Sequence, residues 1–173
     1  RSIFELDSHI KEVDMSVVQR KNLHIAITEY TPAYLWCGGV VPESATSTRE
    51  CFLADSEGYV YAKAPIYSGY PFPVFFTSIA GSEEQYSPIG LHMLEAEQFG
   101  AIIIMMDELK KNNTLVSEIR QTDEYDFSFI TDKSWTLLWS TSEDYRKSVN
   151  NLNLVLAEIV RKGNVGILKI IDL

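Results

Sequence analysis

The sequence predicts an α+β fold in which a mostly antiparallel β-sheet carries two helices on one face. Short runs of alternating apolar and polar residues predict half-buried strands along most of the chain. Two longer segments, 95–112 and 143–162, instead repeat apolar residues at helical spacing. The 173 residues are 46% hydrophobic and 23% charged, which is typical of one globular domain with part of a second.

The first half of the chain is predicted to contain mainly strands. Residues 2–10 have the apolar spacing of the end of a helix, but from residue 11 the period changes to two. A polar turn at 19–22 joins two alternating runs into a hairpin with one polar face. Asp55 and Gly58 favour a tight turn, because aspartate can cap the turn amides and glycine readily adopts a positive φ. Strands are predicted at 13–17, 23–28, 34–37, 51–54 and 59–61.

The second half of the chain contains both predicted helices. Residues 65–88, rich in proline, glycine and aromatics, are expected to be mostly irregular and to precede them. The apolar stripe of the first helix consists of Phe99, Ile102, Ile103, Met106 and Leu109. The last helix is expected to be capped by Thr141 or Ser142 and to end at Gly163. Its buried stripe consists of Tyr145, Val149, Leu152, Leu156 and Ile159. Strands are predicted at 115–120, 125–131, 135–140 and 165–173.

The two cysteines, Cys37 and Cys51, are predicted to form a disulfide. Each lies where a strand-like run meets the loop between them, so a disulfide would join the two ends of that loop. The alternative is two buried free thiols, because cysteine is also a good small core residue. A zinc site is not indicated, since only three histidines could join the cysteines and none has a recognisable ligand spacing.

Charge and motif content argue against several classes of function. The formal net charge of −9 opposes the phosphate neutralisation that nucleic-acid binding requires. The sequence has no nucleophile elbow and no glycine-rich phosphate loop, so neither an enzymatic activity nor a cofactor is expected. It also has no apolar stretch long enough to span a membrane and no recognisable signal peptide at residues 1–13. We therefore expect the chain to be a piece of a longer protein.

Four stretches of the chain, taken in order, resemble the FtsQ/DivIB family of bacterial cell-division proteins. Residues 22–33 (NLHIAITEYTPA) resemble the closing strand of a POTRA domain. Residues 52–61 (FLADSEGYVY) resemble the first hairpin of the β domain that follows it in this family. The helix, three strands and helix predicted over 95–162 have the family's order, and residues 170–173 (IIDL) match the start of its last strand. The resemblance covers nearly the whole chain.

The resemblance implies a non-catalytic scaffold for assembly of the bacterial divisome. Residues 1–36 would be the C-terminal part of a POTRA domain, whose opening strand and helix are absent, and residues 37–173 an FtsQ-type β domain. Members of the family are single-pass cell-membrane proteins, anchored by a transmembrane helix that this sequence lacks, with this region on the extracytoplasmic side. Their partners are FtsB/DivIC-type and FtsL-type division proteins. An extracytoplasmic location also suits the predicted disulfide.

The C-terminal segment 165–173 is the predicted partner-binding site. It is β-branched and apolar and follows a well-marked helix end, so we expect a strand at or near an exposed sheet edge that could receive a partner strand. The resemblance likewise implies that an FtsB-type partner binds by strand addition. Lys169 would meet an acidic partner, and Ile171 and Leu173 would supply apolar contacts. The alternative is an internal strand that pairs wholly within the chain.

A cell-wall glycan-binding module is the alternative function. Aromatic rings on the surface of a sheet can stack against sugar rings, and aromatic residues are concentrated between positions 59 and 76. The competing interpretation divides these rings between the core and the sheet surface. The residues are Tyr59, Tyr61, Tyr67, Tyr70, Phe72, Phe75 and Phe76.

Overall fold

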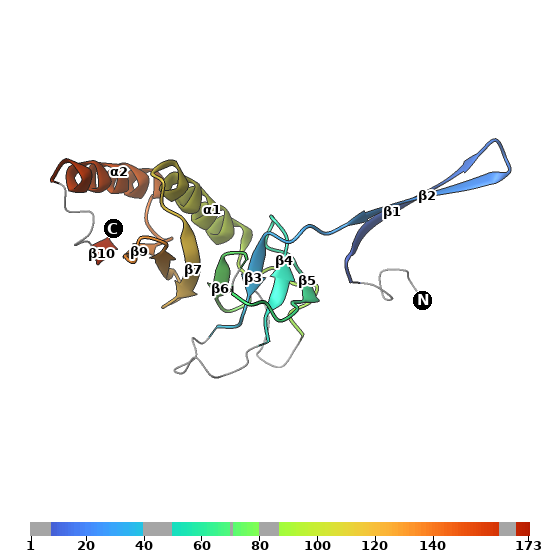
Figure 1. The fold of residues 1–173 in the computed structure, drawn as a ribbon, viewed down its shortest axis with the longest axis horizontal. Coiled ribbons are helices and arrows are strands. Elements are labelled where there is room, and N and C mark those ends of the chain that lie inside the picture. The colour runs from blue at the N-terminus through green and yellow to red at the C-terminus, as the bar shows by residue number, and fades with distance from the viewer. Residues whose placement is uncertain (1–7, 40–49, 70, 80–86, 163–168) are drawn as a thin grey trace.

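The computed structural model describes residues 8–39, 50–69, 71–79, 87–162 and 169–173. In these residues a large mixed β-sheet carries two helices on one face, and a long β-hairpin projects from one end of the molecule (Figure 1). The predicted α+β class is therefore confirmed. The elements are β1 (Ile10–Val18), β2 (Asn22–Glu29), β3 (Tyr34–Trp36), β4 (Phe52–Ala54), β5 (Val60–Lys63), β6 (Val74–Phe76), α1 (Ala96–Lys111), β7 (Val116–Gln121), β8 (Asp126–Thr131), β9 (Thr136–Ser140), α2 (Tyr145–Lys162) and β10 (Ile170–Asp172).

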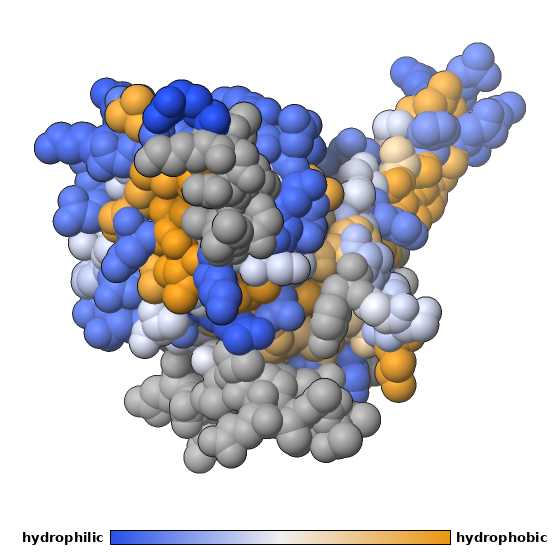
Figure 2. All heavy atoms as spheres, turned by 60° about the vertical axis from the view of Figure 1, so that its left-hand side comes forward, coloured by the Kyte–Doolittle hydropathy of each residue, from blue (hydrophilic) through white to orange (hydrophobic). Residues whose placement is uncertain are grey.

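The projecting hairpin is formed by β1 and β2, which make a two-stranded antiparallel sheet of their own. Gln19 and Arg20 both adopt a positive φ, as the two central residues of a tight hairpin turn do. One face of the hairpin carries three apolar cross-strand pairs: Val13–Ile27, Met15–Ile25 and Val17–Leu23. Most of these side chains are well exposed, and Figure 2 shows them in orange along the projecting arm. The predicted hairpin is confirmed, but its apolar face is mostly exposed and not buried as the alternating pattern predicts.

The large sheet has eight strands in the order β10-β9-β8-β7-β6-β3-β4-β5. Within this sheet four of the described strand pairs are antiparallel and three are parallel, so the sheet is mixed with a small antiparallel majority, in agreement with the prediction. Along the chain, the first strand of this sheet is β3, which begins at Tyr34. Residues 30–33 therefore connect the hairpin to the large sheet. Residues 34–36, expected at the end of the first domain, pair within this sheet.

The described part of residues 65–88 is mostly irregular, as predicted, with one exception, the strand β6. It pairs in parallel with both β3 and β7 and so connects the two halves of the large sheet. Val74 and Phe75 are fully buried within it. Val74, Phe75 and Phe76 have high β-propensity, but a run of three residues after Pro73 is too short to show the period of a strand, and it pairs with segments that are distant in the sequence.

The main core lies between the sheet and the two helices. From α1 the buried side chains are Phe99, Ile102, Met105 and Leu109, while Ile103 and Met106 are only partly buried. The buried face of α1 is thus turned slightly toward Met105 relative to the predicted stripe. The predicted stripe of α2 is confirmed, since Leu152 is fully buried and the other members pack against the same core. Burial of this apolar area, at about 25 cal/mol per Å², is the main stabilising contribution.

A second, smaller core lies on the strands β3–β6. It consists of Leu35, Cys37, Leu53, Tyr61, Ala62, Val74 and Phe76. The Cys37–Cys51 disulfide closes one side of it and confirms the prediction, with the two Cα atoms 4.3 Å apart. Trp36 and Phe52 form the last register pair of β3 and β4, so the two cysteines occupy the next opposed position of that ladder.

The start of α2 and the segment before β1 differ from the predictions. Asp144, and neither Thr141 nor Ser142, caps α2, because its Oδ1 accepts a hydrogen bond from the Arg146 backbone N–H at 3.0 Å. Thr141 instead donates its hydroxyl to the Tyr125 carbonyl. Residues 8–10 of the predicted N-terminal helix form a turn and the first residue of β1. The remainder of that helix, and residues 165–168 of the predicted last strand, lie outside the described residues.

The base of the hairpin is joined to the large sheet by a cluster of tyrosines. Tyr30, which follows β2, stacks on both Tyr59 and Tyr61, with ring centroids 5.2 and 4.9 Å apart. Lys11 of β1 lies over the Tyr30 ring, and its Nζ is 3.8 Å from Oδ2 of the buried Asp55. Asp55 also accepts hydrogen bonds from the Glu57 and Tyr59 amides, which confirms its predicted turn-capping role. Burial raises the pKa of Tyr61 to about 12.

Candidate functional site

The strand β10 lies at the end of the large sheet. It pairs in parallel with β9 on one side, with Ile171 opposite Leu137. On its other side, β10 has no neighbouring strand among the residues that the structure describes. The part of segment 165–173 that is described therefore forms an edge strand. An edge strand of this kind presents backbone groups that can pair with another chain.

The backbone hydrogen bonds show which groups of β10 point outward. The Thr136 amide donates to the Lys169 carbonyl at 2.9 Å, and the Leu173 amide donates to the Leu138 carbonyl at 3.1 Å. Backbone groups alternate in direction along a strand, so those of residues 169, 171 and 173 face β9. The N–H and C=O groups of Ile170 and Asp172 therefore face away from the sheet.

The three predicted partner-binding residues have different surroundings in this strand. Ile171 is only 5% exposed and belongs to the main core, so it holds β10 in place from the inner face. Leu173 is partly buried against the same core, and Lys169 is exposed. Ile170, which the sequence does not mark as a contact residue, is 60% exposed. Figure 2 shows an apolar area on this C-terminal side of the molecule.

The aromatic residues between positions 59 and 76 do not form one exposed platform in the described part of the chain. Tyr61, Phe75 and Phe76 are buried, and Phe75 belongs to the main core whereas the other two belong to the smaller one. Tyr59 packs in the tyrosine cluster at the base of the hairpin. Tyr67 is 37% exposed and meets Phe72 edge to face, while Tyr70 lies outside the described residues. The buried rings are unavailable for stacking on a sugar.

The histidines lie in two separate places. His24 is on the exposed hairpin, whereas His9 and His92 contact Tyr61 and Tyr59 at its base, with ring centroids 5.8 and 5.4 Å apart. In the ranges that the structure covers, no group of three His, Cys, Asp or Glu side chains could hold a metal ion. No helix among the described residues is long and apolar enough to cross a membrane.

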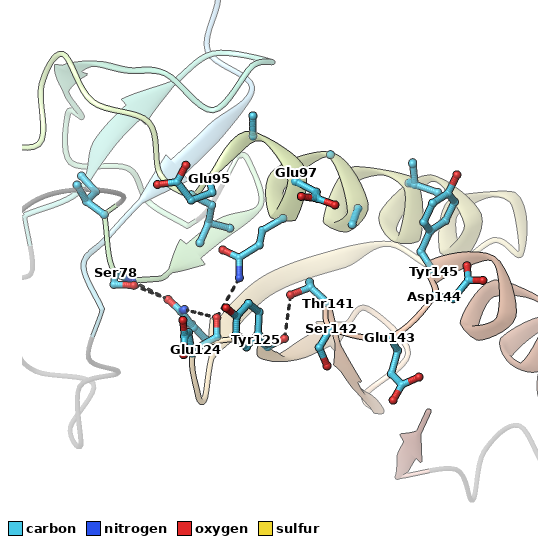
Figure 3. A pocket seen from close by; sticks show the side chains of 18 residues that line it. Ser78, Glu95, Glu97, Glu124, Tyr125, Thr141, Ser142, Glu143, Asp144 and Tyr145 are labelled. Atoms are coloured by element: carbon cyan, nitrogen blue, oxygen red, sulfur yellow. Dashed lines mark hydrogen bonds between the residues drawn. The ribbon is translucent and has the colours of Figure 1, made fainter.

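A groove that the sequence did not indicate lies at one end of the helical layer (Figure 3). It is bounded by residues 78–79, the start of α1, the β7–β8 loop and the β9–α2 loop, and it has a volume of about 1100 Å³. We call it the acidic groove because its lining contains Glu95, Glu97, Glu124, Glu143 and Asp144 but no basic side chain. Apolar side chains among its lining residues include Ile79, Leu94, Ile104, Tyr125 and Tyr145.

Hydrogen bonds connect the segments that border the acidic groove. The Gln98 side chain of α1 donates to the Glu124 carbonyl at 3.0 Å, and the Ser78 amide and hydroxyl both donate to Gln121 Oε1. The Thr141 amide donates to the Tyr125 carbonyl at 2.7 Å. A hydrogen bond to Glu124, together with its charge, raises the pKa of the Tyr125 hydroxyl. The β7–β8 loop is thereby fixed against α1 and the β9–α2 loop, and Gln121 at the end of β7 is joined to Ser78.

The comparisons with known proteins give no assignment. No protein-family model matches the chain, and no curated protein matches it either.

Proposed function

We propose that this chain is a non-catalytic binding module that recruits a partner protein by strand addition at the outer edge of β10. The observation that carries the proposal is the outward direction of the Ile170 and Asp172 backbone groups. Two outward N–H and two outward C=O groups can form a short β-ladder with a partner strand. Each such hydrogen bond contributes about 0.5–1.5 kcal/mol, and the side chains that flank the strand add specificity.

The immediate surroundings of β10 support this mode of binding. Ile171 anchors the strand in the core, so the edge is held in an extended conformation before a partner arrives. Such preorganisation lowers the entropic cost of binding. Exposed Ile170 offers an apolar contact, and Lys169 offers a positive charge to an acidic partner. Leu173 would extend the apolar contact at the other end of the strand.

The biological setting that we propose is assembly of the bacterial divisome, through an FtsB/DivIC-type partner and an FtsL-type partner. It rests on the resemblance of four ordered stretches to the FtsQ/DivIB family, in which residues 1–36 correspond to part of a POTRA domain. The order of helices and strands over residues 95–162 agrees with that resemblance. The Cys37–Cys51 disulfide supports a location on the outer side of the cell membrane, where disulfides persist.

The test is a proline substitution that removes one outward N–H from the edge. Asp172→Pro deletes the outward amide of residue 172, while the Leu173 amide keeps its bond to Leu138. Binding of the extracytoplasmic segment of the FtsB-type protein from the same organism is measured by fluorescence anisotropy. We expect an affinity loss of about tenfold or more, since a ladder bond is lost and the proline ring obstructs the incoming strand.

Asp172→Ala is the matched control. It removes the same side chain but keeps the N–H, so we expect it to bind within about twofold of the unmodified chain. Near-ultraviolet circular dichroism of both variants reports whether the Trp139 side of the core stays intact. Equal binding by the proline and alanine variants, with an intact core in both, would place the partner elsewhere and reject strand addition.

A further inference from the structure

We propose that the acidic groove binds a basic segment of a partner protein that also carries apolar side chains. This site is separate from the β10 edge, where exposed Lys169 favours a partner of the opposite charge. With about 1100 Å³, the groove accommodates several side chains of a peptide. Figure 3 shows the labelled side chains arranged around one hollow, contributed by segments that are far apart in the sequence.

The charge of the groove selects a cationic occupant. Five carboxylates line it, and each of these residues is exposed. Both helices begin at this groove, and their N-termini offset part of that charge, by about half a unit each. Arg146 contacts one lining residue, since its side chain lies 5.7 Å from the centre of the Tyr145 ring. After these three contributions the groove still carries about three negative charges.

Helix capping does not explain the positions of all five acidic side chains around the groove. Asp144 caps α2, and Glu97 lies in the first turn of α1, where a negative charge is favourable. Glu95 occupies the N-cap position of α1, yet its side chain makes no capping hydrogen bond. Glu124 and Glu143 lie in loops. Three of the five carboxylates are therefore placed around the groove without a structural role in starting a helix.

The lining of the groove gives the ligand its apolar character. Ile104 of α1 and Tyr125 of the β7–β8 loop both line it and are 42% and 46% exposed. Covering them would be favourable for a ligand that has apolar side chains between its basic ones. A bare metal ion or a polyamine would satisfy the charge but leave these two side chains in water.

The groove is also preorganised. The β7–β8 loop is held through Gln98, Gln121 and Thr141, so it need not be ordered when a ligand binds. A fixed rim lowers the entropic cost of binding a peptide. Charge, apolar lining and a fixed rim together define a site for a basic, partly apolar peptide segment.

The experiment uses a short fluorescein-labelled peptide that alternates lysine and leucine, titrated with the full 173-residue chain. Glu97→Gln/Glu143→Gln removes two carboxylates from the groove, and Asp14→Asn/Glu29→Gln removes two from the exposed hairpin as a matched control. We expect the groove variant to weaken binding about fivefold or more, the effect of losing two partly exposed ion pairs. The hairpin variant should bind within about twofold of the unmodified chain.

A second pair of variants tests the apolar part of the proposal. Ile104→Asn in the groove should weaken peptide binding about threefold or more, whereas Leu154→Asn, at an exposed position of α2 outside the groove lining, should not.

Equal losses from the groove and hairpin charge variants would show attraction to the overall negative charge and overturn the proposal. Undetectable binding of the peptide would overturn it too. Competition by spermine that equals competition by unlabelled peptide would assign the site to small cations instead.

Discussion

Removing the disulfide should cost this chain about 3 kcal/mol of stability. Cys37 and Cys51 are 14 positions apart, and closing a loop of that length removes about 3 kcal/mol of chain entropy from the unfolded state. The ladder of β3 and β4 already places the two cysteines opposite each other, with Cα atoms 4.3 Å apart. We therefore expect the loss to arise in the unfolded state, which gains conformational freedom when the crosslink is removed.

The assay is urea unfolding followed by tryptophan fluorescence of the oxidised chain and the Cys37→Ala/Cys51→Ala variant. With an m-value of about 2 kcal/mol per molar urea, the midpoint should fall by about 1.5 M. The unmodified chain, reduced before unfolding, should have nearly the same midpoint as the variant, which serves as the control. A midpoint shift below about 0.5 M would refute the argument, because it would mean that the unfolded chain gains little freedom without the crosslink.

Two further predictions concern the turn and the tyrosine cluster near the base of the hairpin. Gly58→Ala should lower the free energy of unfolding by about 1–3 kcal/mol, because Gly58 has a φ of +78° and an added Cβ would lie 3.0 Å from the Phe99 ring. Gly69→Ala, at a φ of +116° with nothing within 4 Å, isolates the backbone strain, and equal losses in the two variants would show that the ring contact is unimportant. The raised pKa of Tyr61, about 12 against 10.0, means that the folded chain keeps a proton that the unfolded chain releases. Stability should therefore fall by up to about 2–3 kcal/mol between pH 10 and pH 12. In Tyr61→Phe this fall in stability between pH 10 and pH 12 should be largely absent, and a fall as large as that of the unmodified chain would show that Tyr61 is not its cause.

Helices and strands whose apolar residues recur at regular spacing were predictable from the sequence. The hairpin, both helices and the strands β7, β8 and β9 were each found within a few residues of their predicted positions. In these segments one face is apolar over several turns or pleats, so the local pattern and the final burial agree. The disulfide was predictable for the same reason, since both cysteines adjoin recognisable strands.

Features that depend on distant partners were not predictable. The strand β6 has only three residues, and its pairing partners β3 and β7 lie far from it in the sequence. The expected cap of α2 is wrong because Thr141 and Ser142 form hydrogen bonds with the Tyr125 carbonyl and the Ser140 hydroxyl, and Asp144 caps the helix instead. The acidic groove is likewise assembled from four separate segments. In the sequence its carboxylates read as ordinary surface charge.

The C-terminal end of β10 and the acidic groove lie on the same side of the large sheet, where β9 and β10 both end. β10 runs parallel to β9, and Asp172 lies opposite Leu138, so both strands end toward the loop that carries Glu143 into the acidic groove. A partner strand paired along β10 would therefore end or begin close to the rim of the groove. If one partner uses both surfaces, Asp172→Pro and Glu97→Gln/Glu143→Gln should each weaken its binding. If two partners bind separately, each variant should affect only one of them. The edge and the groove favour opposite charges in their ligands, and a single partner would need an acidic strand followed or preceded by a basic segment.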